Sequence, residues 1–504
     1  MANGTRLLKR KTFTNVKSQG LDGRPTIFAQ IVYALEGQLI FQSFGASGTV
    51  TGSKHLVVTP NGNRILLDCG LFQGHNKDKD DLNRHFGFDP QTIDMVVLSH
   101  AHIDHSGLLP RLVREGFTGK IYATPATISL CRIMLADSAH IQTDDLKYVN
   151  KRRLLRNEEP IEPLYDEADV EACLELFIPL PYHTPFDIAD DTVLEYTDSG
   201  HLLGSAAAHL SISTPEGIKR ITFTGDIGRY KTAILKDPQP FPQCDYLICE
   251  STYGNRLHDS LPEAEKHILE IVEKVCVHKK GKLIIPAFSV GRTQTLIYAL
   301  DKLQKVGALP NIPVYVDSPL SYKATEVMLR HTECYNQAIL DYMKKDENPF
   351  HFKNLTYIKD AEESKALNKK EEPCIIVSAS GMAEAGRVKH HIKNNIEDPN
   401  NAIMLIGYCT PDSLGGRLRD GNKEVKIFGE LFEVKARIYN FESYSSHADY
   451  EGIFTYLECQ EKTKIKEIFL VHGEEQTVLS FKEKFMERGF GKVSIPRRKE
   501  LFVL

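Results

Sequence analysis

Long apolar runs are missing from this sequence of 504 residues. No run approaches the roughly 20 residues that a membrane-spanning helix needs, and the first sizeable apolar segment, 27–35, starts too far from the N-terminus for an ordinary signal peptide. We therefore expect a soluble, cytoplasmic protein with no membrane partner. Apolar residues make up 41% and charged residues 26% of the chain, which excludes a disordered or collagen-like polypeptide.

CxxC pairs are also missing, although the chain has ten cysteines. Several of these cysteines, including Cys249 and Cys374, lie inside apolar runs. This distribution favours reduced core residues in a cytosol-like compartment over disulfides or thiolate metal sites.

An excess of basic charge is missing as well, because 62 Lys and Arg residues are set against 67 Asp and Glu residues. The net charge is −5, so a nucleic-acid partner would need a local basic surface or a metal centre. One local basic segment is the N-terminal arm, residues 1–37, which has five basic residues before its first acid, Asp22. The arm fits a flexible extension, and a targeting segment or an RNA-binding tail stays open.

The pattern of apolar and charged residues changes along the rest of the chain, as expected for two or three domains. Short apolar runs from about residue 38, with a turn at Asn61-Gly-Asn63, predict β-hairpins. We interpret 45–54 as a strand turn, because its glycine spacing does not match a phosphate-binding loop. The charged segment 140–190 is expected to form helices over 151–156 and 167–176 that decorate the core. After about 255, apolar strands alternate with amphipathic helical stretches, which predicts a parallel sheet with strands at 283–286, 314–316, 375–377 and 403–406.

The strongest chemical signal is His100-Ala-His102-Ile-Asp104-His105, which follows the apolar run 95–99. Imidazoles at alternate positions can converge on one cation, and the carboxylate and third imidazole that follow can reach a second cation. Nitrogen and carboxylate oxygen suit Zn²⁺, and Mn²⁺ or Fe is also compatible.

Three further residues follow strand-like runs in the same manner. They are His201 in a glycine-flanked turn, Asp226 after 221–225, and His472 after 468–471. Strand termini are where α/β proteins collect active-site residues. Five histidines and two aspartates therefore form a candidate site for two metal ions.

These motifs, in this order, resemble those of the metallo-β-lactamase fold. The similar pieces are LLDCG (66–70), HAHIDH (100–105), SGHLLGS (199–205), TGD (224–226) and the late His472. Further pieces resemble the β-CASP branch, whose members process nucleic acids. They are CESTYG (249–254), FSVGRTQ (288–294), SASGM (378–382) with Gly386-Arg387, SSHAD (445–449) and LVHGE (470–474). The likeness covers about 38–504, outside the long 140–190 segment, and no KH-type module precedes it.

The resemblance implies an α/β fold: a metallo-β-lactamase αββα sandwich with an inserted α/β β-CASP domain. The corresponding domains are 38–254 for the first part of the sandwich, 255–437 for the β-CASP domain, and 438–504 for the second part.

The resemblance also implies the roles of single residues. One metal would be held by His100, His102 and His201, and the other by Asp104, His105 and His472, with Asp226 and a hydroxide bridging them. Asp68 would orient ligands without binding metal. Glu250 and His447 would form the acid pair at the leaving oxygen, and Asp104 counts with them among the catalytic residues. Candidate phosphate contacts are Arg292, Ser380 and Arg387.

The expected function is hydrolysis of phosphodiester bonds in single-stranded RNA by a ribonuclease with two Zn²⁺ ions per chain, or Mn²⁺ in their place. Two cations about 3.5–4 Å apart would activate a bridging water, and protonated His447 would release the 3′ oxygen and leave a 5′-phosphate. Three alternatives stay open: a hydrolase of a thioester, lactam or lactone, a DNA nuclease, and a non-catalytic RNA-processing scaffold. The sequence leaves endo- or exonuclease mode and a homodimer undecided.

Overall fold

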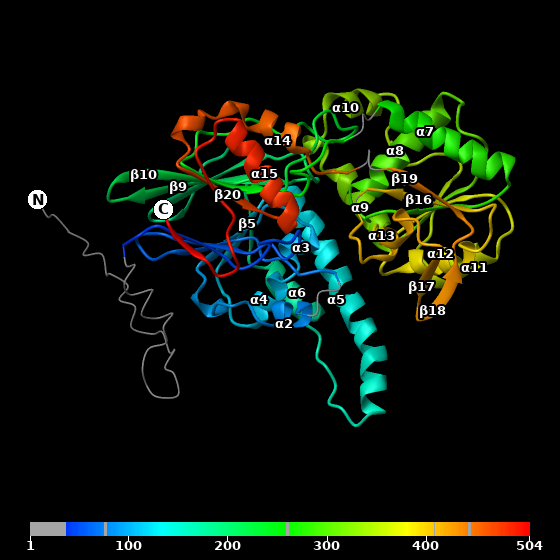
Figure 1. Ribbon diagram of the computed structural model, residues 1–504, viewed down its shortest axis with the longest axis horizontal. Coiled ribbons are helices and arrows are strands. Elements are labelled where there is room, and N and C mark those ends of the chain that lie inside the picture. The colour runs from blue at the N-terminus through cyan, green and yellow to red at the C-terminus, as the bar shows by residue number, and fades with distance from the viewer. Residues whose placement is uncertain (1–36, 75–77, 259–261, 408, 442–444) are drawn as a thin grey trace, which may run out of the picture.

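The computed structural model describes residues 37–74, 78–258, 262–407, 409–441 and 445–504 (Figure 1). Nearly all of the predicted basic arm lies outside these residues. Two seven-stranded sheets lie on one side of the molecule and a six-stranded sheet on the other, as Figure 1 shows.

The first seven-stranded sheet begins with the predicted hairpins. β1 pairs antiparallel with β2, and β2 pairs antiparallel with β3 across the Asn61 turn. The segment 45–54 connects β1 to β2, as expected for a strand turn. The sheet order is β22 (Leu501–Val503), β1 (Ile40–Ser43), β2 (His55–Val58), β3 (Arg64–Leu67), β4 (Met95–Val97), β5 (Lys120–Ala123) and β6 (Phe177–Pro179).

The second seven-stranded sheet faces the first. Its order is β21 (Lys492–Ser494), β20 (Glu467–Val471), β11 (Tyr246–Glu250), β10 (Gly217–Phe223), β9 (Ala206–Thr214), β8 (Thr192–Asp198) and β7 (Phe186–Ala189). Side chains alternate between the two faces of each strand. In β20, Phe469 and Val471 therefore enter the core between the sheets, while Ile468 and Leu470 pack on the outer side.

The six-stranded sheet is parallel throughout and contains the four strands predicted for it. Its central strands, 283–286, 375–378 and 402–406, are buried at every position because both faces of the sheet are covered: Ile375 and Val377 join one core cluster and Ile376 joins another. The order is β14 (Leu355–Tyr357), β13 (Val314–Asp317), β15 (Ile375–Ser378), β12 (Leu283–Pro286), β16 (Ala402–Ile406) and β19 (Arg437–Phe441). β19 takes this sheet past the boundary predicted at 437; the other domain boundaries stay predictions.

Helices cover the outer faces of all three sheets (Figure 1). On the sandwich they are α2 (Lys79–Arg84), α3 (Ile103–Ser106), α4 (Leu109–Arg114), α5 (Pro125–Leu154), α6 (Glu167–Leu174), α14 (Tyr450–Tyr456) and α15 (Glu475–Glu487). Around the parallel sheet they are α7 (Pro262–Val272), α8 (Arg292–Lys305), α9 (Pro319–Arg330), α10 (Gln337–Met343), α11 (Ala361–Lys369), α12 (Arg387–Asn395) and α13 (Leu414–Arg419). A short ribbon joins β17 (Glu424–Ile427) to β18 (Glu430–Glu433).

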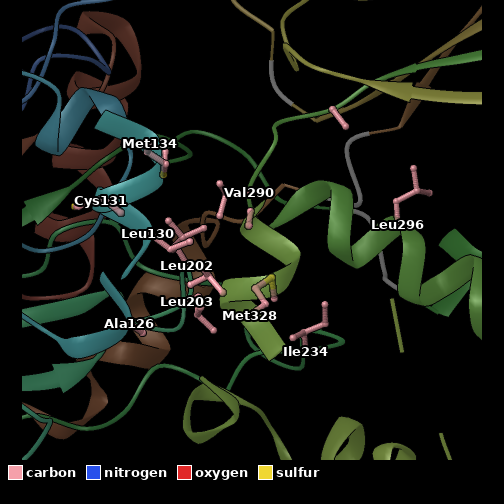
Figure 2. Close-up of a cluster of buried hydrophobic side chains, with 14 of the residues drawn as sticks. Ala126, Leu130, Cys131, Met134, Leu202, Leu203, Ile234, Val290, Leu296 and Met328 are labelled. Carbon is pink, nitrogen blue, oxygen red and sulfur yellow. The ribbon is translucent and has the colours of Figure 1, made fainter. Parts of the chain in front are cut away.

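One apolar cluster runs from the sandwich into the parallel-sheet domain. Figure 2 shows Leu202 and Leu203 between Leu130 of α5 and the side chains of Val290 and Met328. Since Leu202 follows His201 directly, this packing ties the position of a candidate metal ligand to the contact between the two domains.

The segment 140–190 does more than decorate the core, so that part of the sequence interpretation is wrong. The predicted helices are present as the end of α5 and as α6. However, Val170 and Cys173 of α6 are buried in the main cluster, and the same segment supplies the edge strands β6 and β7. Its many charges hid a short apolar stripe and two strands of three or four residues, which are too short to give a clear period.

All ten cysteines are free, and nine of them are buried, with Cys459 as the exposed one. This confirms that they are mostly core residues. None of the helices in the described ranges combines the length and apolar character that crossing a membrane requires.

Candidate metal centre

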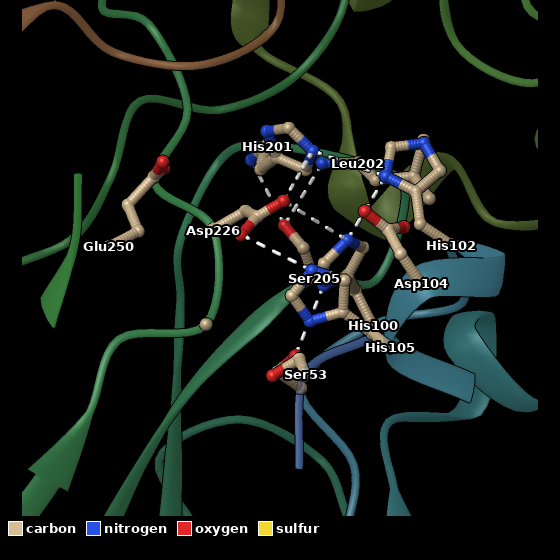
Figure 3. Close-up of polar contacts among 12 residues, drawn as sticks. Ser53, His100, His102, Asp104, His105, His201, Leu202, Ser205, Asp226 and Glu250 are labelled. Carbon is tan, nitrogen blue, oxygen red and sulfur yellow. Dashed lines mark hydrogen bonds and ion pairs between the residues drawn. The ribbon is translucent and has the colours of Figure 1, made fainter. Parts of the chain in front are cut away.

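The candidate ligands meet at one edge of the sandwich because each follows a strand that ends there. His100 lies just after β4, His201 after β8, Asp226 after β10 and His472 after β20. The short helix α3 begins directly after His102 and carries the remaining two, Asp104 and His105. Figure 3 shows the side chains pointing toward one another from separate segments.

A first group of four donor atoms surrounds one point. Nδ1 of His102 lies 3.0 Å from Nε2 of His100 and 3.3 Å from Nε2 of His201. Oδ2 of Asp226 lies 3.6 Å from Nε2 of His100 and 3.5 Å from Nε2 of His201. Ligands about 2.0–2.1 Å from a tetrahedral zinc ion lie about 3.3–3.4 Å from one another. The spacing of this group therefore fits such a cation.

A second group lies on the other side of Asp226. Nε2 of His105 is 3.1 Å from Nε2 of His472, which is in turn 3.6 Å from Oδ2 of Asp104. Oδ1 of Asp226 is 3.4 Å from Nε2 of His105. Each Asp226 oxygen thus faces a different group, which is the arrangement required of a bridging carboxylate.

Burial and charge prepare these side chains for a cation. Burial lowers the pKa of His100 and of His201 well below the ordinary value, and that of His102 to about 4. These imidazoles are therefore neutral and can offer a lone pair. Burial alone would raise the pKa of Asp226, but the surrounding histidines, His105 first, hold it well below its usual range. The buried atoms Oδ1 of Asp226 and Nδ1 of His201 have no hydrogen-bond partner among the described residues.

Two glycines allow the loops to approach this closely. A Cβ on Gly70 would lie 1.6 Å from the carbonyl oxygen of Asp104. A Cβ on Gly228 would lie 2.0 Å from the carbonyl oxygen of Gly200, next to His201. Larger residues at 70 and 228 would push the ligand loops apart.

Asp68 lies behind His105, one of the candidate ligands. Its Oδ2 accepts a hydrogen bond from Nδ1 of His105 at 2.7 Å, which leaves Nε2 of that ring facing the centre. The backbone N–H of Ser99 donates to Oδ1 at 2.8 Å, and the hydroxyls of Ser53 and Ser99 donate to Oδ2. Asp68 is thus held rigidly and can orient His105.

Glu250 and His447 lie in contact beside the candidate ligands. Nδ1 of His447 donates to Oε2 of Glu250 at 3.2 Å and lies 3.8 Å from Oδ2 of Asp226. Burial disfavours the charged imidazole, but the negative charges of Glu250 and Asp226 raise the pKa of His447 above its ordinary value. His447 is therefore suited to carry a proton next to the centre.

Thr252 and His258 are two contacts that sequence reasoning missed. The hydroxyl of Thr252 donates to Glu250 at 2.6 Å and lies 3.0 Å from Nδ1 of His472, so it can fix the tautomer that leaves Nε2 of His472 free. Nε2 of His258 donates to the backbone carbonyl of His447 at 3.0 Å. Thr252 lies inside the CESTYG motif, whereas His258 has no local signal, because its partner is distant in sequence.

The three candidate phosphate contacts have different surroundings. Arg292 begins α8 and its guanidinium lies 4.9 Å from the ring of Phe288, with Nε and Nη1 buried and without a hydrogen-bond partner among the described residues. A Cβ on the preceding Gly291 would lie 3.2 Å from Leu202, so this helix end adjoins the His201 loop. The hydroxyl of Ser380 bonds to both backbone groups of Ala385.

Arg387 is engaged elsewhere. Its Nη1 pairs with Oδ1 of buried Asp317 at 2.7 Å, and its Nη2 donates to the carbonyl of Lys359 at 2.9 Å. This geometry favours a structural role over the predicted phosphate contact, because the guanidinium compensates a buried charge. The Gly386-Arg387 motif in the sequence gave no sign that Arg387 pairs with Asp317.

Replacing Arg387 with alanine should therefore lower the free energy of unfolding by about 1.5–3 kcal/mol, the value of a hydrogen bond to a charged group. The apparent affinity for RNA should not change. Denaturant unfolding and RNA titration measure the two effects. Lys389→Ala is a control on the same helix, since the ammonium of Lys389 contacts the ring of Phe428, whereas Arg387 pairs with the buried Asp317. Weaker RNA binding at unchanged stability would restore the phosphate role.

The chain is similar to known proteins over most of its length. Three family profiles cover successive parts of the chain: the metallo-beta-lactamase superfamily at 49–252, the Beta-Casp domain at 293–418, and the Zn-dependent metallo-hydrolase RNA specificity domain at 432–496. Ribonuclease TTHA0252 of Thermus thermophilus is 34% identical over 456 residues, which cover 90% of this chain and 97% of the relative. The chain belongs to the β-CASP family of the metallo-β-lactamase superfamily.

Other relatives of this β-CASP protein are longer. Transcription termination factor FttA of Methanosarcina mazei is 30% identical over 86% of this chain and 67% of the relative. The FttA of Methanocaldococcus jannaschii is 31% identical over 87% and 68%. A crystal structure of a protein of unknown function from Enterococcus faecalis V583 superposes with a TM-score of 0.50 at 12% identity over 93% of this chain and 100% of that one, which shows a shared fold.

Proposed function

We propose that the protein is a ribonuclease that hydrolyses phosphodiester bonds of single-stranded RNA with two zinc ions per chain and leaves a 5′-phosphate. Its membership of the β-CASP family and its likeness to a relative named as a ribonuclease support a metal-dependent nuclease. The observation that carries the proposal is the position of Asp226 between two groups of ligands, with the acid pair Glu250 and His447 alongside.

The residues present fit the two ions. His100, His102 and His201 would hold one, Asp104, His105 and His472 the other, and Asp226 would face both. Bound there, the ions would supply an activated water and would neutralise charge on the phosphoryl oxygens.

The remaining steps belong to the protein's own side chains. His447, kept protonated by Glu250, is close enough to the centre to give a proton to the departing 3′ oxygen. The phosphate then stays on the 5′ oxygen of the downstream fragment. Arg292, with unsatisfied guanidinium nitrogens beside the His201 loop, is the proposed contact for a neighbouring phosphate. A small-molecule hydrolase would leave this pair and the parallel-sheet domain without a role.

One assay tests substrate and mode together. Single-stranded RNA and DNA of one sequence, labelled at the 5′ or 3′ end, are incubated with the protein and the product lengths are read. We expect cleavage of RNA with 5′-phosphorylated products. Cleavage of DNA alone, or hydrolysis of thioesters and lactones without cleavage of RNA, would refute the proposal.

The purified protein should contain close to two zinc-class ions per chain, because the two ligand groups are separate. His102→Ala should remove at least one ion, since His102 contributes a donor atom to the first group only. Elemental analysis of protein purified without chelator measures this. His85→Ala is the matched control, because the side chain of His85 is 71% exposed, pairs with Asp81 and belongs to neither ligand group. Intact activity in a metal-free preparation would contradict the dinuclear centre.

A further inference from the structure

Helix α5 has two halves with opposite surroundings. Its buried residues all lie in the first half: Ala126, Thr127, Leu130, Cys131, Met134, Leu135 and Ala139. None of residues 140–155 is buried. At about 1.5 Å per residue, this second half extends about 22 Å beyond the body, and Figure 1 shows it projecting from the sandwich. In this subsection we call residues 140–155 the arm; it is distinct from the N-terminal arm, residues 1–37.

The chain returning from the tip covers only one face of the arm. The side chain of Asn150 bonds to both backbone groups of Ile161, at 2.8 and 2.9 Å, and Nε of Arg153 donates to the carbonyl of Glu159 at 2.7 Å. The opposite face has no covering segment among the described residues. Positions on that face recur at intervals of three and four residues, which is a heptad stripe: Ile141, Asp144, Tyr148, Lys151 and Leu155.

Large apolar side chains are concentrated on the arm. Ile141, Tyr148 and Leu155 follow one another at seven-residue intervals and are 46%, 66% and 80% exposed. Val149 and Leu154 are exposed as well. These five are a third of the 15 large apolar residues found exposed in the described parts of the chain. Exposed apolar groups gathered in this way mark an interaction surface.

The charges identify the partner. The uncovered face carries one acidic and one basic residue, Asp144 and Lys151, beside its apolar side chains, so this face offers no net positive charge to a polyanion such as RNA. The charges are segregated along the helix: Asp144 and Asp145 lie in the first half, while the basic residues follow at 147, 151, 152, 153 and 156. Two copies of the arm therefore attract when antiparallel and repel when parallel.

We propose that the uncovered face of the arm binds the same face of a second copy of this chain in antiparallel orientation, centred on Tyr148. Ile141 and Leu155 are equidistant from Tyr148 in sequence, so each meets the other in the partner helix. The acidic half of each arm then faces the basic half of the other. The two bodies lie at opposite ends of the helix pair, because the last buried residue, Ala139, precedes the paired segment.

The size of the contact predicts its strength. Four helical turns from each copy bury less than the roughly 1,200 Å² at which stable interfaces begin. The dimer should therefore be reversible and depend on protein concentration and salt. It requires neither metal nor RNA, so its failure would leave the proposed nuclease activity unaffected.

Sedimentation velocity of the full chain over a concentration series tests the proposal. We expect a monomer–dimer equilibrium that the double variant Tyr148→Asp/Leu155→Asp abolishes. Leu479→Asp/Met486→Asp is the matched control, because these residues are also seven apart on a helix, at 45% and 60% exposure. A wild-type protein that stays monomeric throughout, or a dimer that the arm variant leaves unchanged, would overturn the proposal.

Charge reversal and cross-linking test the orientation. Asp144→Lys/Asp145→Lys and Lys151→Glu/Arg152→Glu should each weaken the dimer, and all four changes together should restore it. In a Cys459→Ser background, which removes the exposed cysteine, Ile141→Cys should cross-link to Leu155→Cys in a mixture and not to itself. Self-cross-linking of Ile141→Cys would show a parallel pair. Loss of RNA binding by Lys151→Glu/Arg152→Glu without a change in mass would instead make the arm an RNA contact.

Discussion

Asp226→Asn is expected to lower the rate of RNA hydrolysis by about 10²-fold or more while the protein stays folded. Losing an outer contact to a metal ligand already costs about 10–100-fold, and Asp226 faces both ligand groups. Its Oδ2 lies 3.6 Å from His100, and its Oδ1 lies 3.4 Å from His105. The amide keeps the shape of the side chain but removes the negative charge that both cations would share.

Single-turnover cleavage and metal content measured on the same preparation check this expectation. Asp245→Asn is the matched control: Asp245 directly precedes β11, at the end of that strand opposite to Glu250, and its carboxylate accepts a hydrogen bond from the N–H of Arg220. The control should cleave RNA normally. A folded Asp226→Asn protein that cleaves at the wild-type rate would show that Asp226 does not bridge the metals.

His447→Ala should reduce turnover by about 10²–10⁴-fold, the usual contribution of a positioned general acid, and both metals should be retained. An activated nitrophenyl phosphodiester should hide much of the loss, since its leaving group needs no proton. Glu250→Gln should behave similarly, and the double variant should be little worse than either single variant because the two residues act as one unit. Loss of a metal on replacing His447 would make it a ligand and leave His472 structural.

Glu250 and His447 should also determine how the rate of RNA hydrolysis depends on pH. Glu250 and Asp226 raise the pKa of His447 above its ordinary value of 6.5, and the proposed acid works in its protonated form. Activity should therefore fall as the pH rises through that raised pKa. In Glu250→Gln the raising charge is lost, so the falling limb should move to lower pH. A falling limb that does not move would show that Glu250 does not control the protonation of His447.

Local sequence patterns predicted many of the elements and the residues that gather at the centre. The Asn61 turn and its flanking apolar runs predicted the β2–β3 hairpin, and the continuous apolar runs predicted the parallel strands. Both predictions succeeded because turn residues and hydrophobic period act over a few neighbouring residues. The residues of the HAHIDH motif lie at the centre for the same reason, since their spacing alone brings them close together.

Contacts between distant residues depend on how the chain packs. His105 and His472 are separated by 367 positions and lie 3.1 Å apart; no local pattern encodes that distance, and the family resemblance alone had grouped them. The contacts of His258 with His447 and of Arg387 with Asp317 were found in the structure without any such guide. The uncovered face of α5 is a further case, because exposure depends on what the rest of the chain leaves unpacked. Local sequence fixes conformation through short-range sterics and periodicity, whereas partners across the fold are set by how the sheets pack.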